Sequence, residues 1–285
     1  MSAEFEFIRY EGVTNGVAQI ALARPDKRNA QNKAMLYELN EALDTAAHDD
    51  DCKVILLSAD GPDFSSGHDM KDRDPLTQKP VGTWGGFGQP GIEGHWSFEE
   101  EVYLGFCWRW RNIPKPTIVQ VQGRVIAGGL MLVWPFDVII ASEDARFSDP
   151  VVAFGVNGVE YFAHPWEVGV RKAKEMLFTG EAITADEAKT LGMVNHVVPR
   201  DELGEFSLNM AEHIARQPMV GLKLAKQSVN QMQDAQGLWP ALQAAMSLQH
   251  MGHAHERLLH KVAVEPEGED KIKKQAKKEK PNTFD

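Results

Sequence analysis

Two short segments rich in small residues each follow a predicted strand, and both could present backbone N–H groups to a bound molecule. They are Phe64–Met70 (FSSGHDM) and Val125–Leu132 (VIAGGLML). The first N–H groups of a helix have no partner within the helix and attract negative charge. One N–H from each segment, directed at one oxygen, would form an oxyanion hole for an acyl carbonyl. Close packing at glycine also explains such segments, and on spacing alone it is the simpler interpretation.

The second segment lies within a longer stretch, Ile113–Phe147, whose pattern predicts the elements that must position it. Thr117–Gln122 is a β-branched run typical of a buried strand. After the glycines, Leu130–Trp134 has the apolar bulk of a short buried helix, and Asp137–Ser142 is a second β-rich run. A strand followed by a small-residue turn also occurs earlier, at Val54–Ser58. Alternation of this kind predicts an α/β fold with layered sheets.

The whole chain divides into three parts. Residues 1–200 alternate β-rich and helical patterns and begin with a hairpin signal, Phe5–Tyr10 and Val17–Ala23. Residues 201–260 are predicted to be helical. Residues 261–285 are dense in Lys and Glu, which indicates a solvated or partly ordered tail.

The segment Asp72–Glu101 interrupts the core pattern with prolines, glycines and aromatic residues. No helical or strand period fits its first part, and a loop of this length in a compact domain is usually a lid, a binding loop or disordered. Its aromatic residues favour an ordered, packed loop. The segment is therefore predicted either to form a wall of the site or to be a surface insertion.

Composition and charge argue against several classes of partner. The chain has 285 residues, a formal net charge of −11 and no basic block except near its C-terminus, so neither nucleic acid nor an anionic membrane is expected as the main partner. Its two cysteines form no CxxC motif, which makes a reducing compartment the default. No run of residues is long enough to span a bilayer, and the N-terminus has no secretion signal. We therefore expect a cytoplasmic protein.

Other familiar catalytic and metal motifs fit poorly. Phe64–Met70 contains the residue types of a hydrolase triad, but neighbours on one turn cannot converge as a triad does. The glycines of residues 85–88 lack the strand–turn–helix context of a dinucleotide fingerprint. One predicted helix carries several histidines without a zincin pattern, so we expect a solvated helix face and no metal site. These histidines are His250, His253, His255 and His260.

Several motifs, in one order along the chain, resemble those of the crotonase superfamily, the enoyl-CoA hydratase/isomerase group. The similarity extends from Val17 to about Pro199. The resemblance implies a crotonase-like spiral of ββα units, followed by a helical C-terminal trimerisation region and hence a homotrimer or hexamer. The matching segments are Arg24–Ala30, Phe64–Met70, Pro114–Phe147, Phe178–Gly180 and Gly192–Pro199.

Members of this family bind acyl-CoA thioesters and stabilise a thioester enolate with two backbone N–H groups. By this resemblance the two groups are those of His68 and Gly129, and Gly129 then lies at the start of a helix whose dipole favours the charge. Coenzyme A is part of the substrate, so no separate cofactor and no metal are implied. The segments expected along the CoA end supply the candidate substrate-binding residues, which are Arg24, Lys27, Ser66, Asp69 and Lys71.

The chain departs from the family pattern where hydratases carry two water-activating glutamates. Leu132 and Val151 stand at these positions, and an apolar side chain can neither hold nor deprotonate water. Glu160 is next to the position where some isomerases and dehalogenases of the family carry an acid, and we predict it as the catalytic acid or base. A carboxylate that merely favours the first turn of a helix is an equally good interpretation. Weaker candidates are Asp149, His164 and His95.

The leading interpretation is an acyl-CoA enzyme of hydratase or isomerase type whose exact reaction the sequence leaves open. One alternative is a CoA-thioester isomerase or hydrolase that uses Glu160. Another is a non-catalytic acyl-CoA binder that has lost its acids. RNA binding on such a scaffold needs a basic face, which the net charge disfavours.

Overall fold

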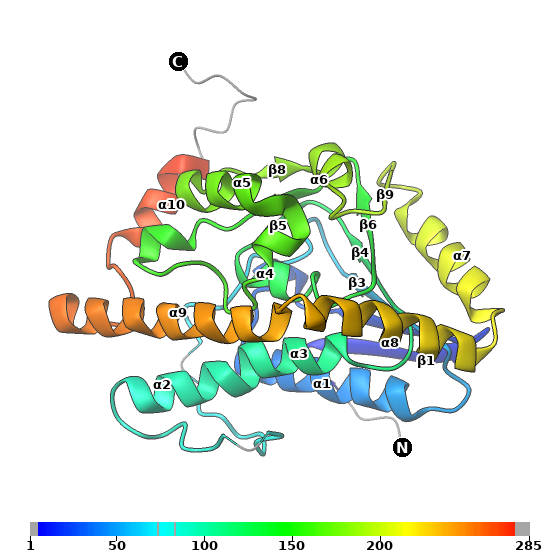
Figure 1. Ribbon diagram of the computed structural model, residues 1–285, viewed down its shortest axis with the longest axis horizontal. Coiled ribbons are helices and arrows are strands. Elements are labelled where there is room, and N and C mark those ends of the chain that lie inside the picture. The colour runs from blue at the N-terminus through cyan, green and yellow to red at the C-terminus, as the bar shows by residue number, and fades with distance from the viewer. Residues whose placement is uncertain (1–4, 73, 83, 277–285) are drawn as a thin grey trace.

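A six-stranded sheet is the centre of the fold in the computed structural model, which describes residues 5–72, 74–82 and 84–276. Its strand order is β1-β2-β3-β4-β6-β9 (Figure 1). β1 and β2 form an antiparallel hairpin, and each later pair of neighbours is parallel. In this order the strands span Ile8–Thr14, Val17–Leu22, Val54–Ala59, Thr117–Val121, Val138–Ser142 and His196–Val198.

A second, three-stranded sheet has the order β5-β7-β8. β5 follows β4 closely along the chain and leads into the helix α4. Likewise, β7 follows β6 closely and leads into the 3-10 turn η3. The chain thus passes twice from the large sheet into the small one, which is the repeated ββα unit that the resemblance implied. The strands of the small sheet span Arg124–Ile126, Arg146–Ser148 and Ile183–Thr184.

Side chains alternate along each strand, and on the main sheet apolar side chains point to both faces. Helices cover both faces and bury these side chains. On β3, Ile55 and Leu57 belong to the large core that includes α1, whereas Val54 and Leu56 pack with α7. Within the described residues, no helix is both long and apolar enough to cross a membrane. The helices are α1 Lys33–His48, α2 Ile92–Glu99, α3 Phe106–Arg111, α4 Gly128–Met131, α5 His164–Thr179, α6 Ala185–Leu191, α7 Leu203–Ala215, α8 Met219–Ala235, α9 Leu238–His260 and α10 Gly268–Ala276, with short turns η1 Pro25–Lys27, η2 Glu100–Gly105 and η3 Val151–Phe154.

The segment Asp72–Glu101 is a loop only in its first part. α2 begins at Ile92, runs through the π-helical turn η2 and continues as α3 to Arg111. In this broken helix α3 contacts α1 and α2 contacts α9, alongside which the helix runs (Figure 1). The prolines and glycines before Ile92 conceal its helical period from a sequence-based prediction.

The start of the predicted tail is ordered. α10 packs against η3, and the N–H of Glu265 donates to the carbonyl of Phe154 at 2.9 Å. A Cβ atom at Gly268 would lie only 2.4 Å from a ring carbon of Phe154, so the two segments are in close contact. The tail residues 277–285 lie outside the described residues.

Asn29 ties the loop before α1 to the turn after β3. Its side chain is fully buried, and its backbone has a left-handed φ of 50°. The side-chain oxygen accepts from the N–H of Arg24 at 2.9 Å. The side-chain amide donates to the carbonyls of Asp60 and Asp63 at 2.9 and 3.1 Å. These bonds hold two loops side by side at the edge of the sheet.

Replacing Asn29 by Ala is expected to lower the free energy of unfolding by about 2–4 kcal/mol, because three hydrogen bonds are lost at a buried position. Urea denaturation followed by circular dichroism measures this change. Asn15→Ala is the matched control, since Asn15 has a similar φ of 52° but is exposed and its side chain bonds only to Glu212. Equal losses in the two variants would show that backbone strain, and not the buried bonds, sets the effect.

Candidate functional site

Two turns from distant parts of the chain lie backbone to backbone. Ser65 and Val125 form a parallel β-bridge. Within it, the N–H of Ser65 donates to the carbonyl of Arg124 at 3.2 Å, and the carbonyl of Ser65 accepts from the N–H of Ile126 at 3.0 Å. A Cβ atom at Gly67 would lie 2.8 Å from the carbonyl oxygen of Ile126. A residue with a side chain therefore cannot replace Gly67 without separating the turns.

Both turns contain backbone N–H groups that make no hydrogen bond within the described residues. In the first turn, the N–H groups of Ser66 and Asp69 both donate to the loop before α1, at 3.0 and 2.9 Å. Across residues 5–72, 74–82 and 84–276, by contrast, no acceptor is bonded to the N–H of His68 or of Gly129. Since a buried donor without an acceptor is costly, these two groups are available to a bound oxygen.

The chain enters α4 through a strained residue. Ala127 has φ 48° and ψ −115°, a conformation that a side chain disfavours. Its N–H donates to the carbonyl of Ser148, and its carbonyl accepts from the N–H of Leu130, both at 2.8 Å. The surrounding backbone thus imposes the sharp turn that places Gly129 in the first turn of α4.

Glu160, the predicted acid or base, lies against the first of the two turns. Its side chain is only 6 % exposed. One carboxylate oxygen is 3.2 Å from Nε2 of His68, and the other accepts from the amide of Gln249 at 3.4 Å. The ring of His68 stacks on Tyr103 with 4.1 Å between ring centroids. A Cβ atom at Gly128 would lie 2.7 Å from that ring, so the imidazole of His68 lies between Glu160 and the start of α4.

The pKa of His68 is raised above its usual value. Burial by itself lowers this pKa, but the charge of Glu160 and its hydrogen bond with His68 more than offset the effect. The carboxylates of Glu99 and Asp149 act in the same direction more weakly. The contact with Glu160 thus favours the protonated form of His68.

Two of the weaker candidates, Asp149 and His164, form a fully buried pair. Nε2 of His164 lies 2.8 Å from a carboxylate oxygen of Asp149, and both side chains are 0 % exposed. The same carboxylate oxygen accepts from the N–H of Val159 at 2.9 Å. Because Val159 directly precedes Glu160, this pair positions Glu160. The third weaker candidate, His95, lies on α2 and pairs with Glu99.

Leu132 and Val151, the two positions at which the family resemblance led us to expect glutamates, both lie in apolar or partly buried surroundings. Leu132 is completely buried in the main core, directly after α4. Val151 begins η3 and is half-buried. Neither side chain can hydrogen-bond a water molecule.

The candidate substrate-binding residues fall into two groups. Arg24 and Asp69 are bonded to each other at 2.7 Å. Burial alone raises the pKa of Asp69, but the bond from Arg24 lowers it below its usual value, so the pair is an internal ion pair that fixes the first turn. Lys27 and Lys71 are exposed and Ser66 is half-buried, so these side chains are accessible to solvent on the surface around the first turn, which we call the rim.

One prediction about α9 is wrong, and two contacts of the site were missed. His250 and His253 are only 7 % and 4 % exposed, because the unpredicted helix α2 packs on the face expected to be solvated. Tyr103 and Gln249 touch the His68–Glu160 pair from η2 and α9. No local sequence pattern marks these two residues, since their role depends on helix packing over long separations.

Comparison with known proteins gives a consistent result. The sequence profile of a family described as Enoyl-CoA hydratase/isomerase matches residues 12–260. A Mycobacterium tuberculosis protein named "Putative enoyl-CoA hydratase EchA13" is 45 % identical over 261 residues, which cover 88 % of this chain and 82 % of that protein. The 2,3-dehydroadipyl-CoA hydratase of Escherichia coli is 30 % identical over 235 residues, covering 81 % of this chain and 83 % of the relative.

Solved structures extend the comparison to the fold. The crystal structure of an enoyl-CoA hydratase/isomerase from Xanthobacter autotrophicus Py2 superimposes with a TM-score of 0.80 at 30 % identity. The aligned part covers 96 % of this chain and 94 % of that one. A Mycobacterium smegmatis structure, described as a probable enoyl-CoA hydratase, has a TM-score of 0.83 at 45 % identity and covers 91 % and 99 % of the two chains.

The raised pKa of His68 leads to a pH-dependent contribution to stability. This contribution is fully present below the unfolded pKa of about 6.5 and is lost as the pH rises through the higher folded pKa. Glu160→Gln should lower the His68 pKa, measured by NMR titration of the ring protons, with His68→Gln used to assign the signal. The stability advantage of the wild type over Glu160→Gln in urea should shrink from acidic to alkaline pH. An unchanged His68 titration in Glu160→Gln would contradict this account.

Proposed function

The chain belongs to the enoyl-CoA hydratase/isomerase family, and we propose that it moves a proton on an acyl-CoA thioester through an enolate held by the N–H groups of His68 and Gly129. The family relationship makes it an enzyme of the hydratase/isomerase type. The observation that carries the finer proposal is the position of Glu160. The ring of His68 lies between this buried carboxylate and Gly128 at the start of α4, and the backbone N–H groups of His68 and Gly129 make no bond within the described residues.

The proposed chemistry needs a base and a site for developing negative charge. Glu160 removes a proton next to the thioester carbonyl, and the electron pair moves to the carbonyl oxygen. The N–H groups of His68 and Gly129 stabilise that oxygen because fixed dipoles in a buried site favour the enolate over the neutral thioester. Return of the proton two carbons further along a 3-enoyl chain gives the conjugated 2-enoyl thioester. Atoms and charge balance without water or a redox cofactor.

A proton shift fits this chain better than the addition of water. Addition of water requires groups that hold the water and exchange protons with it near the β-carbon. Leu132 and Val151 offer none at the expected positions. Glu160, with a hydrogen bond from His68, can both accept and return one proton, which is sufficient for isomerisation.

We assign binding of the CoA portion to the rim, the exposed surface around the first turn. Arg24 and Asp69 hold that turn through their own ion pair. The exposed ammonium groups of Lys27 and Lys71 can approach phosphate oxygens, and Ser66 lies in the same turn as His68, two residues before it. Coenzyme A is then the only cofactor-like group that the reaction uses, and it arrives with the substrate.

The test is a panel of 2-enoyl, 3-enoyl and saturated acyl-CoA thioesters, followed by the absorbance of the conjugated thioester and by free thiol. We expect a gain of conjugation from the 3-enoyl substrate. Glu160→Gln should reduce kcat by about 100-fold or more, since a general base is lost, while binding of a saturated acyl-CoA is retained.

The control is Glu143→Gln, which removes an exposed carboxylate on the loop after β6 and should leave turnover unchanged. Loss of conjugation from the 2-enoyl substrate would mean hydration, and released thiol would mean hydrolysis. Unchanged turnover in Glu160→Gln would remove Glu160 from the mechanism. Binding without any of these reactions would support a non-catalytic binder.

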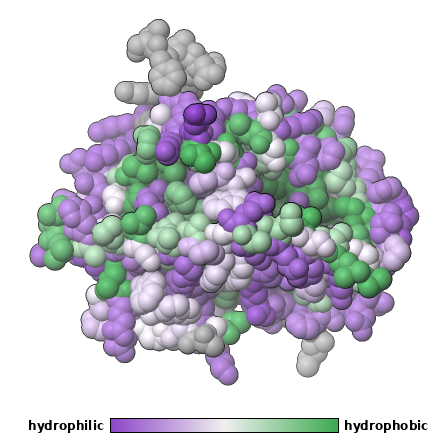
Figure 2. Space-filling model, viewed as in Figure 1, coloured by the Kyte–Doolittle hydropathy of each residue, from purple (hydrophilic) through white to green (hydrophobic). Residues whose placement is uncertain are grey.

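We further propose that the chain acts as a homo-oligomer, a trimer or a pair of trimers, as its family resemblance implied. α8 and α9 carry apolar side chains that are more than half exposed at near-helical spacing. Figure 2 shows apolar patches at both ends of the band that these helices form across one face of the molecule. Exposed apolar residues in this number favour burial against another chain. They are Val220, Leu224, Val229, Met232, Leu248, Met251, Leu258 and Leu259.

Leu224→Glu should therefore shift the protein to smaller species, because a charge is placed in a proposed interface. Size-exclusion chromatography with light scattering measures the mass. Leu191→Glu is the matched control, an exposed leucine of α6 given the same charge outside α8 and α9. If wild-type protein is already monomeric at micromolar concentration, the oligomer proposal fails.

A further inference from the structure

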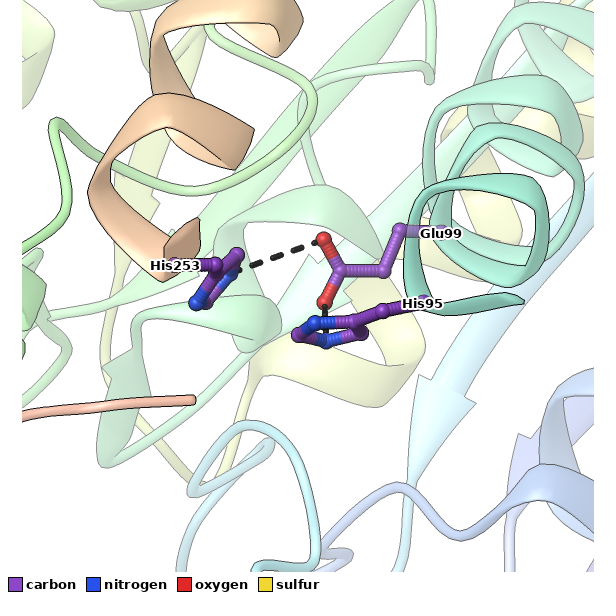
Figure 3. A group of neighbouring side chains, drawn as sticks. All are labelled: His95, Glu99 and His253. Atoms are coloured by element: carbon purple, nitrogen blue, oxygen red, sulfur yellow. Dashed lines mark ion pairs between the residues drawn. The ribbon is translucent and has the colours of Figure 1, made fainter. Parts of the chain in front are cut away.

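A second cluster of titratable side chains lies where α2 meets α9, and the proposed reaction does not use it. Glu99 ends α2, with His95 one helical turn before it, and His253 faces the same carboxylate from α9 (Figure 3). His250, on the same helix as His253, also reaches this carboxylate. Glu99, His250 and His253 are 4 %, 7 % and 4 % exposed. Residues of α2 and α9 that are more than 150 positions apart in sequence thus bring one carboxylate and three imidazoles together.

The hydrogen bonds of the rings determine which nitrogens face Glu99 with a lone pair. Nδ1 of His250 lies 3.0 Å from the carbonyl of Met246, and Nδ1 of His253 lies 2.6 Å from the carbonyl of Ala263. A carbonyl only accepts, so both Nδ1 atoms carry the proton. In the neutral rings, Nε2 is then a bare acceptor directed at Glu99. Histidine ligands of metals commonly donate their second ring nitrogen to a carbonyl in this way.

The facing atoms have no hydrogen bonds of their own. One carboxylate oxygen of Glu99 lies 3.2 Å from Nε2 of His250 and 3.7 Å from Nε2 of His253. All three atoms are buried and make no hydrogen bond within the part of the chain that the structure describes. Lone pairs directed at one another in the interior repel, and a shared cation removes that repulsion.

The spacing of these atoms suits a transition-metal ion. With bonds of 2.0–2.2 Å to nitrogen and oxygen, the ligands of a tetrahedral zinc site lie about 3.3–3.5 Å apart. The two measured separations bracket that distance. The ligand atoms of His95, Glu99 and His253 lie within 4.8 Å of one another.

His95 completes the group on its other side. Its Nε2 is 2.6 Å from the second oxygen of Glu99, and its Nδ1 accepts from Arg257 at 3.2 Å. Nε2 of His95 therefore carries a proton, which must leave if a metal takes its place. His95 also lines an open cavity of about 500 Å³ together with Arg257 and Phe98, so this side of the group faces solvent.

We propose that Glu99 and His253, completed by His250 and His95, bind one divalent transition-metal ion of the zinc class. Imidazole and carboxylate ligands suit zinc, cobalt and nickel rather than magnesium or calcium. Four protein ligands make a closed, structural site. The ion fastens α2 to α9, next to Gln249, which bonds to Glu160.

The experiment uses the untagged full-length protein, stripped with a chelator and titrated with Zn²⁺ and with Co²⁺. One equivalent per chain should bind, with the visible absorption of tetrahedral Co²⁺ and a higher melting temperature. His253→Asn should weaken binding by more than about 100-fold, beyond the 10–100-fold cost of losing an orienting partner. The Asn amide can still donate to the Ala263 carbonyl, so the fold is retained and circular dichroism checks this.

Two controls separate this cluster from other histidines. His255→Gln changes an exposed histidine two residues along the same helix and should bind as the wild type does. His260→Gln disrupts the group formed by Glu256, His260 and Glu265, and should also leave binding unchanged. Absence of stoichiometric binding by the wild type, wild-type affinity in a folded His253→Asn variant, or loss of binding in His260→Gln would overturn the proposal.

Discussion

The pairing of Ser65 with Val125 is the contact on which the geometry of the site depends. Ser65 is completely buried and makes hydrogen bonds to three segments of the chain. Its backbone joins β5, its hydroxyl donates to the carbonyl of Asn29 at 2.9 Å, and the same hydroxyl accepts from the N–H of Gly67 at 3.2 Å. One small polar residue thus links the loop before α1, the first turn and the second turn. The two free N–H groups keep their relative positions because these three segments cannot move separately.

Around this backbone frame, α9 connects two buried carboxylates. Gln249 bonds to Glu160, and the next residue, His250, faces Glu99. Phe98 in α2 packs edge-on against Tyr103, which stacks on His68. A change in how α2 packs on α9 would therefore affect Glu160, the proposed base, in two ways. One is through the hydrogen bond from Gln249, and the other is through the aromatic contacts of Phe98, Tyr103 and His68. Through this packing, the segment Asp72–Glu101 is in direct contact with the side chains around His68 and Glu160.

Much of the fold could be predicted from the sequence because it is encoded locally. The hairpin and the buried strands follow from period, β-branching and turn residues, and the structure has them. The pairing of the two small-residue turns could be suspected only from motif order. Burial of His250 and His253 could not be predicted, because it depends on α2, whose period is concealed by the glycines before it. Long-range packing, and not local propensity, decides those residues.

The π-helical turn at Glu100–Gly105 has a consequence for how this helix can change over evolution. A π turn holds one residue more than an α turn, so it is equivalent to an insertion carried within a helix. Deleting one residue within this turn would convert it to an α turn and leave α2 and α3 in register. Trp110 would keep its bond to Asn40, and Arg111 its bond to the carbonyl of Asn230. A deletion within a regular turn of α3 would instead rotate all that follows by about 100° around the helix axis, so this helix tolerates one-residue changes in length at the π turn and not beyond it.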